Sequence, residues 1–256
     1  MVKRTLPAQP VSGLIDGFAS LQAVLAAGEP IGCREIGRRC DLNRTRANRL
    51  LGTWRHLGMV QQNEEDKYEP GPALFTMAGM SLHSSPILRC ALPLAQRWWK
   101  DGFCVSLGIR WQDRINFILH ANPNRPFLES IGGRPSDAAV RSSAGLASLA
   151  QTTKLEIKKY DCEKQWQEQG DGCSFETVLS HVHNHGFATR TYSDSTRSVG
   201  VALKDSPAAF AVSKKHLSAK QARHTAKDLI NDIAELVESI KVAEKNTSLE
   251  FKPINA

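Results

Sequence analysis

The sequence predicts an α+β protein in which an N-terminal winged helix-turn-helix precedes a larger domain of helices packed on an antiparallel sheet. A chain of 256 residues exceeds what one ordinary core holds, so two domains are expected. Within residues 12–75, three segments with helical spacing of apolar residues are followed by two short segments around a polar turn. Beyond Gly102 the spacing alternates between that of strands and that of helices, which is typical of an α+β arrangement.

The composition is that of a globular protein, with 41% hydrophobic and 23% charged residues. The N-terminus is basic but no apolar segment follows it, and no uncharged apolar run is long enough to span a bilayer. The six cysteines are scattered without a C-x-x-C pair, which favours reduced thiols. We therefore expect a cytoplasmic protein that does not contact the membrane.

Two helices are expected at the start of the N-terminal domain. The first covers residues 12–27 and ends at Gly28-Glu29-Pro30, because glycine caps a helix and proline stops it. The second covers residues 33–39, buries Ile36 and ends at Cys40-Asp41-Leu42, where the leucine fills the turn before the next helix. The first helix is expected to face the core with four side chains, Leu14, Phe18, Leu21 and Leu25.

A third helix is expected after Asn43, which serves as its N-cap. Residues 34–55 contain seven arginines and two acidic residues, so most of the net charge of +7 is concentrated there. The guanidinium group binds phosphate and guanine edges with paired hydrogen bonds, so this helix suits the major groove of DNA, although a merely solvated basic face is the alternative. Its apolar stripe comprises Ala47, Leu50, Leu51, Trp54 and Leu57. The expected base contacts are Arg44, Arg46 and Asn48, the expected phosphate contacts are Arg49 and Arg55, and Asn43 and Thr45 complete the surface.

A β-hairpin follows in the position of a wing. Gly58 ends the third helix, and residues 59–62 and 67–69 flank the polar turn at residues 63–66. Because the tip of this turn is acidic, it should be held away from the DNA backbone, with Lys67 and the flanking amides making any contact.

These features resemble the IclR family of bacterial transcription regulators. The resemblance lies in residues 42–51, in Leu57-Gly58-Met59-Val60, and in Tyr68 and Gly71 before Pro72-Ala73-Leu74. It implies binding to double-stranded DNA and a GAF-like effector domain behind the winged helix. Asp16-Gly17-Phe18 stands where the family has an arginine before a small residue and leucine, so the phosphate contact of that arginine is not carried over.

The second domain is expected to mix helices and strands. A linker helix over residues 71–82 precedes a helix that starts at Pro86 and stops at Gly102. A last helix from Ser218 to about Ala243 should cover one face of the sheet with an apolar stripe. The expected strands cover residues 103–109, 114–119, 186–191, 198–203 and 208–213.

Residues 140–150 resemble the family's small-residue motif, which precedes the helix lining the effector pocket. Ser142 and Ser143 can cap that helix, and free amides at a helix N-terminus favour a carboxylate. We therefore hypothesise a small organic anion as effector; the alternative is an ordinary capped helix packed through alanine and glycine. The expected effector residues are Ser142, Ser143, Ala144, Gly145, Arg134 or Arg141 as counter-ion, and Asp194.

Two segments depart from the family pattern. Thr191-Tyr192-Ser193-Asp194 follows Gly186-Phe187 where relatives commonly have paired acids. The family's strand with cysteine and proline is represented by Val199-Gly200-Val201-Ala202-Leu203. A second interpretation is therefore a sensor domain that no longer binds a ligand.

No other chemistry is favoured by the sequence. His181 and His185 share a helix face near Cys173, but no acid stands between them as in a zinc protease, so we expect surface histidines, no metal and no cofactor. Nucleophile elbows, phosphate loops and dinucleotide fingerprints are absent from the sequence, so an enzyme is not expected. The first alternative is a ligand-independent DNA-binding protein. The second, which the sequence favours less, is a metal- or thiol-dependent hydrolase with a nucleic-acid-binding module.

The resulting expectation is a transcription regulator that binds a pseudo-palindromic operator as a homodimer or tetramer, because one recognition helix reads too few base pairs. The expected organisation is an arm at residues 1–11, the winged helix at 12–75, the end of a linker helix at 76–85, the effector domain at 86–243 and a tail at 244–256.

Overall fold

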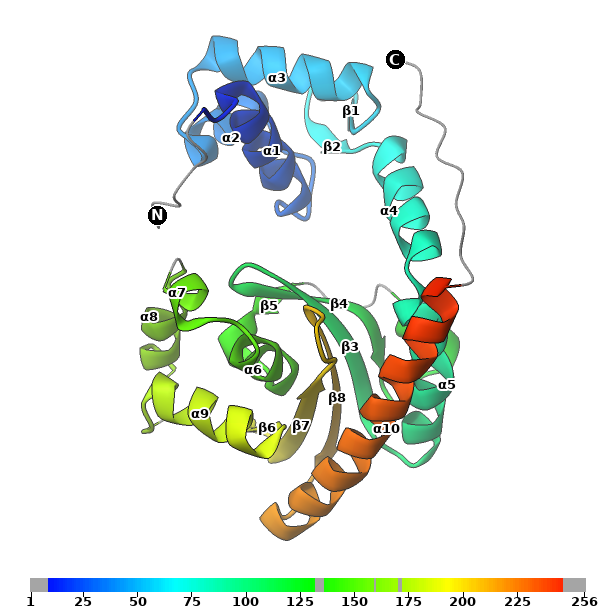
Figure 1. Cartoon of the computed structure of the whole chain (residues 1–256). Coiled ribbons are helices and arrows are strands. Elements are labelled where there is room, and N and C mark those ends of the chain that lie inside the picture. The colour runs from blue at the N-terminus through cyan, green and yellow to red at the C-terminus, as the bar shows by residue number, and fades with distance from the viewer. Residues whose placement is uncertain (1–8, 132–135, 159, 170–171, 246–256) are drawn as a thin grey trace. The chain divides into compact units, whose positions relative to one another are not determined.

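The computed structural model describes residues 9–131, 136–158, 160–169 and 172–245. The chain divides into two compact units between Ser85 and Pro86 (Figure 1). In the described residues, none of the helices has the length and apolar character needed to cross a membrane.

The N-terminal unit is a winged helix-turn-helix, as expected. Its elements are α1 (Ser12–Leu25), α2 (Cys33–Cys40), α3 (Arg44–His56), β1 (Val60–Gln62), β2 (Tyr68–Pro70) and α4 (Pro72–Ser84). The wing strands β1 and β2 are antiparallel, and Ile31 forms a bridge to Tyr68 beside them. Ile36, Leu51 and Val60 are almost fully buried and form the centre of this core.

The expected core face of α1 was wrong. Leu14, Phe18 and Leu25 are 56%, 54% and 48% exposed, and Leu21 alone of the four expected residues is buried. The face that packs inward contains small residues, because the Trp54 ring lies against Gly17 and its indole nitrogen donates a hydrogen bond of 2.9 Å to the Gly17 carbonyl. A Cβ at Gly17 would lie 3.2 Å from that ring, so the glycine permits the close approach of α1 and α3.

Leu57 is a second correction. It was expected on the apolar stripe of the third helix, but it is the C-cap of α3 and is 44% exposed. The helix ends before its side chain can follow the stripe into the core.

The C-terminal unit is built on a six-stranded antiparallel sheet in the order β5-β4-β3-β8-β7-β6. The strands are β3 (Cys104–Trp111), β4 (Arg114–Ala121), β5 (Asp137–Ala138), β6 (Ala188–Thr191), β7 (Thr196–Ala202) and β8 (Ala208–Lys215). The five longer strands confirm the expected antiparallel sheet, whereas β5, with two residues, was not anticipated.

Helices cover both faces of this sheet (Figure 1). One face packs on α5 (Pro86–Lys100) and α10 (Ala219–Lys245), around Leu107, Phe210 and Leu229. The other, which we call the α6 face, packs on α6 (Ser143–Ala150), α8 (Cys162–Gln167) and α9 (Phe175–His185). Three short helices complete the unit, η1 (Phe127–Ser130), η2 (Ala139–Arg141) and α7 (Lys154–Ile157).

Candidate DNA-binding surface and candidate effector site

The N-terminus of α3 is capped as the sequence predicts. The Asn43 side chain accepts a hydrogen bond of 2.9 Å from the Arg46 amide, which satisfies one of the free amides of the first turn. Ala47 and Leu51 of the same helix are fully buried. The other face is exposed along its length and carries Arg44, Thr45, Arg46, Asn48, Arg49 and Arg55.

Three of these exposed side chains are held by neighbouring elements. Arg46 forms an ion pair with Asp16 of α1, and the two side chains are 45% and 26% exposed. The Cys33 thiol of α2 donates to the Asn48 side-chain oxygen at 2.8 Å. Arg55 donates to Gln62 of the wing at 2.7 Å. The helix α3 is therefore tied to α1, α2 and the wing through its polar face as well as through its core.

Arg44 and Arg49 differ from these three. Within the residues that the structure describes, neither side chain makes a hydrogen bond or ion pair. Their guanidinium groups are therefore available to an anion without breaking a described contact.

The arginines of α2 are partly neutralised within their own helix. Glu35 binds Arg38 at 2.7 Å and Arg39 at 2.8 Å. These hydrogen bonds lower the pKa of Glu35 to about 2, so the carboxylate stays ionised at neutral pH. The net positive field of this stretch therefore comes mainly from α3.

The wing tip places Lys67 beside an acid. The Asn63 side chain accepts hydrogen bonds of 3.0 Å from the amides of Glu65 and Lys67, which closes the turn. The Lys67 ammonium lies 2.7 Å from the Glu65 carboxylate, and this contact raises the pKa of the lysine. A DNA contact by Lys67, which stays a prediction, would have to compete with this ion pair.

The expected effector segment at the start of α6 is closely packed. Ser142 is the N-cap and accepts from the Gly145 amide at 3.0 Å, while the hydroxyls of Ser143 and Ser198 lie 2.6 Å apart. Residues 142–145 are all buried. A Cβ at Gly145 would lie 2.0 Å from the Ala139 carbonyl oxygen, and one at Gly200 would lie 2.4 Å from the Ser143 carbonyl. Glycine is therefore required at both positions, because η2 and β7 contact the backbone of α6 directly.

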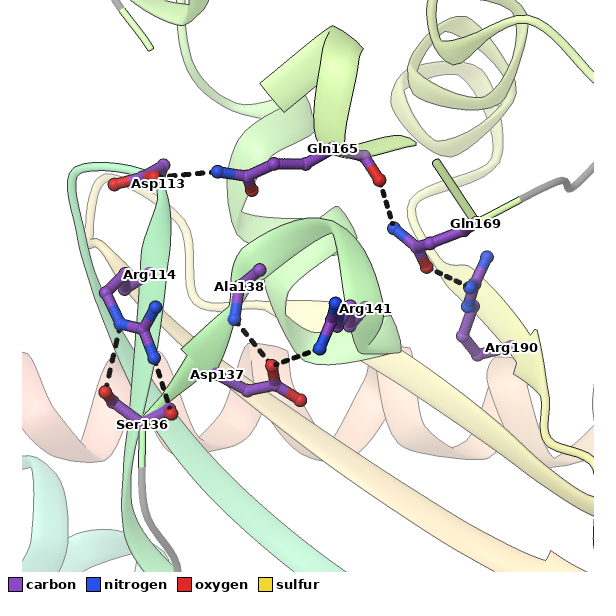
Figure 2. A network of polar contacts seen from close by, with 9 residues as sticks. All are labelled: Asp113, Arg114, Ser136, Asp137, Ala138, Arg141, Gln165, Gln169 and Arg190. Carbon is purple, nitrogen blue, oxygen red and sulfur yellow. Dashed lines mark hydrogen bonds and ion pairs between the residues drawn. The ribbon is translucent and has the colours of Figure 1, made fainter. Parts of the chain in front are cut away.

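Of the two expected counter-ions, Arg134 and Arg141, the structure describes Arg141. Arg141 is 63% exposed at its side chain and lies 3.8 Å from Asp137, beside the Arg114–Ser136 contact (Figure 2). Arg134 lies outside the described residues. Their role in effector binding stays a prediction.

Asp194 closes the turn between β6 and β7. Its carboxylate accepts hydrogen bonds from the Thr196 amide at 3.1 Å and from the Thr196 hydroxyl at 2.9 Å. Both contacts lower the pKa of Asp194. The structure thus gives this carboxylate a local partner in the hairpin, and its role in an effector site also stays a prediction.

The sheet register reveals a row of polar residues that the sequence analysis missed. Arg190 of β6 pairs with Ser198 of β7, Ser198 with Ser213 of β8, and Ser213 with Cys104 of β3. Residues opposite one another in antiparallel strands point to the same face, and Ser198 contacts α6, so the whole row lies on the α6 face. Finding it from sequence requires the strand order, which local patterns do not contain.

Arg190 anchors one end of a chain of hydrogen bonds. Its guanidinium lies 5.0 Å from the centre of the Trp166 ring and donates to Gln169, whose amide donates to the Gln165 carbonyl at 3.1 Å. Gln165 in turn donates to Asp113 at 3.0 Å, in the turn between β3 and β4 (Figure 2). Arg190 is partly buried, and this burial lowers its pKa. Water screens a partly buried cation less than an exposed one.

The two histidines of α9 contact one another. The rings of His181 and His185 stack with centres 4.1 Å apart, and His185 Nδ1 lies 2.9 Å from the His181 carbonyl. Burial and the neighbouring His185 lower the pKa of His181.

Several solved structures share this fold. No protein-family model matches the sequence, and a search of curated proteins gives no match. An IclR-family transcriptional regulator from Brucella abortus is 18% identical, with a TM-score of 0.74 over 94% of this chain and 97% of the other. An IclR transcriptional regulator from Alicyclobacillus acidocaldarius is 17% identical, with a TM-score of 0.66 over 90% and 99% of the two chains. An IclR homologue from Microbacterium hydrocarbonoxydans, solved in complex with 4-hydroxybenzoate, is 15% identical, with a TM-score of 0.64 over 89% and 99%.

Proposed function

Because this chain has the fold of IclR-type transcription regulators, we propose that it is a DNA-binding transcription regulator whose affinity for its operator is modulated by a small molecule. The observation that carries the proposal is the exposed basic face of α3, capped by Asn43 and opposite a fully buried Ala47 and Leu51. This is the arrangement that presents arginine side chains to a groove while the other face is anchored in a core. In this proposal the protein binds DNA in the cytoplasm and catalyses no reaction.

We propose that the regulator binds a pseudo-palindromic operator as a dimer. Exposed apolar side chains on α1 and α4 support a protein partner, because apolar surface is stabilised when a partner buries it. No residue of α4 is buried, and Phe75 is 77% exposed. The apolar side chains concerned are Leu14, Ile15, Phe18, Leu25, Phe75, Met77, Met80 and Leu82.

The test is footprinting on DNA adjacent to the gene of this protein. We expect a protected segment containing two half-sites about 10 base pairs apart, or a multiple of that spacing. A variant lacking Arg44, Arg46 and Arg49 should lose protection. A control that removes two arginines elsewhere, Arg38 and Arg39, which bind Glu35, should retain protection, and so should the variant that also lacks Arg34 and thus matches the loss of three charges. Uniform, steeply salt-dependent binding to every DNA would instead support a ligand-independent DNA-binding protein.

We further propose that the effector is a small organic acid bound on the α6 face. The neighbour solved with 4-hydroxybenzoate suggests aromatic acids as the first compounds to screen. Arg190 is a more favourable counter-ion than Arg141, because Arg190 is partly desolvated whereas Arg141 is largely exposed and near Asp137. Ser142, Ser143 and Gly145 would contribute the polar edge of α6, and the close packing there requires a local opening.

A thermal-shift screen of aromatic and aliphatic carboxylates tests this site. A ligand at a hundred times its dissociation constant adds about 2.7 kcal/mol to the free energy of unfolding. We expect Arg190→Gln to abolish the shift and Arg141→Ala to preserve it. If no acid stabilises the protein, or if both variants respond as the parent does, the organic-acid site is refuted and the DNA-binding proposal is unaffected.

A further inference from the structure

A cysteine, a serine and a histidine meet on the α6 face where β3 pairs with β4. The Cys104 sulfur lies 3.7 Å from Nε2 of His120, and the Ser106 hydroxyl lies 2.8 Å from Nδ1 of the same ring. Ser106 and His120 are directly opposite in the strand register, and Cys104 is two residues before Ser106. The three side chains therefore share a face because of the strand geometry.

This arrangement is that of a thiol with an oriented base. When Nδ1 carries the ring proton it donates to the Ser106 hydroxyl, which leaves the lone pair of Nε2 directed to the thiol. A base at this position takes up the thiol proton and increases the fraction of thiolate, which is the nucleophilic form. Cys104 and His120 are each partly exposed.

Three serines lie close to this pair in or beside the sheet, and the hydroxyl of one of them, Ser130, is buried. Cys104 pairs in register with Ser213, next to Ser198 in the polar row. The bridge between Leu119 and Ile131 brings Ser130 near the same end of β4. The Ser130 hydroxyl is buried and, among the described residues, has no hydrogen-bond partner, which is costly unless a further group accepts from it.

We propose that Cys104 captures small α,β-unsaturated carbonyl compounds by covalent addition. His120 Nε2 takes the thiol proton, and the sulfur forms a bond to the β-carbon of the ligand. The π electrons move towards the carbonyl group as an enolate, and the proton on Nε2 then passes to the α-carbon. The product is a thioether containing all atoms of both reactants, His120 is again neutral, and neither an oxidant nor a leaving group is required.

The reactivity of Cys104 is independent of the proposed regulatory function; its consequence for operator binding rests on that function. A bulky adduct in the polar row would alter packing near Ser198 and α6. Covalent modification of Cys104 is thus a signal to the regulator that differs from reversible binding of an organic acid.

The test uses the full chain and methyl vinyl ketone at neutral pH, followed by intact-mass measurement and peptide mapping. Two other cysteines serve as internal references: Cys173 is exposed, and burial raises the pKa of the Cys162 thiol to about 11. An ordinary thiol is a few per cent ionised at pH 7, and the gain in thiolate is partly offset by lower intrinsic nucleophilicity. We therefore expect Cys104 to react about three times faster than Cys173 or more, and Cys162 to remain unmodified.

Variants separate this mechanism from simple exposure. His120→Gln and Ser106→Ala should reduce the rate at Cys104 while the rate at Cys173 stays constant, and Ser106→Thr should restore it. Cys104→Ser should lose the fast adduct. Reaction at Cys104 no faster than at Cys173 in the parent chain overturns the proposal whether or not the variants fold, and so does an unchanged rate in a folded His120→Gln. Absence of DNA binding by the unmodified chain would count against the regulatory function alone.

Discussion

The ion pair between Asp16 and Arg46 predicts a measurable change in DNA affinity. Arg46 lies on the exposed face of α3, and Asp16 of α1 binds its guanidinium in the unbound protein. A DNA phosphate or base that binds Arg46 must compete with this carboxylate, and the carboxylate also repels the DNA backbone. Replacing Asp16 by Asn should therefore strengthen binding.

The size of this effect follows from the solvent exposure of the two side chains. The side chains of Arg46 and Asp16 are 45% and 26% exposed, so solvent screens the pair and its free energy is about 0.5–1 kcal/mol. Asp16→Asn should thus lower the dissociation constant for DNA about two- to fivefold. The slope of the logarithm of affinity against the logarithm of salt concentration should steepen by less than the equivalent of one released counterion. The free energy of unfolding should fall by a similar 0.5–1 kcal/mol, roughly.

Fluorescence anisotropy with a labelled operator at several salt concentrations measures both quantities. Glu156→Gln is the matched control, because it changes the net charge equally from α7 in the other unit. Unchanged affinity in Asp16→Asn would refute the competition. Weaker binding would refute it as well, because that result would make Asp16 a positioning residue for Arg46.

Further outcomes follow from other contacts. Arg46→Ala should relax base preference by about 1–3 kcal/mol in a selection assay, whereas Arg55→Ala should weaken all sequences alike and reduce the salt slope by about one; equal loss of preference in both variants would contradict these assignments. Gly145→Ala should lower the free energy of unfolding in urea by roughly 3 kcal/mol, because the added Cβ meets the Ala139 carbonyl oxygen at 2.0 Å; the matched substitution Gly79→Ala, in open space on α4, should cause no such loss. The pKa of Glu35 is lowered to about 2 in the folded state, so its ion pairs are fully present above the ordinary value of 4.5 and are lost as the pH falls through about 2; a carboxyl NMR titration midpoint near 4.5 would show that the pairs with Arg38 and Arg39 do not persist in solution.

Local patterns were sufficient for the elements of this fold. Alternation predicted strands at residues 103–109 and 114–119, and the structure has β3 and β4 there, because a half-buried strand must alternate its side chains. Asn43 was predicted as an N-cap, and its side chain accepts a hydrogen bond from the Arg46 amide. These features depend on neighbours within a few residues, which a sequence displays directly.

Contacts between elements that are distant in the sequence could not be predicted from these local patterns. Helical spacing on α1 identified its apolar side chains but selected the wrong inward face, since Gly17 and Ser20 admit Trp54 from another helix. The meeting of Cys104 with His120, and the row from Arg190 to Cys104, depend on strand order and register. Neither is encoded in the periodicity of any single segment.

The contact between Gly17 and Trp54 also bears on the spacing of half-sites that the proposed dimer would bind. It holds the axis of α1 against α3 through a close backbone approach and the indole hydrogen bond. If two chains associate through the exposed side of α1, the distance between their recognition helices is set by this contact, and so is the separation of the DNA half-sites. A larger residue at position 17 would then alter which operator spacing is bound, without changing any residue that touches DNA.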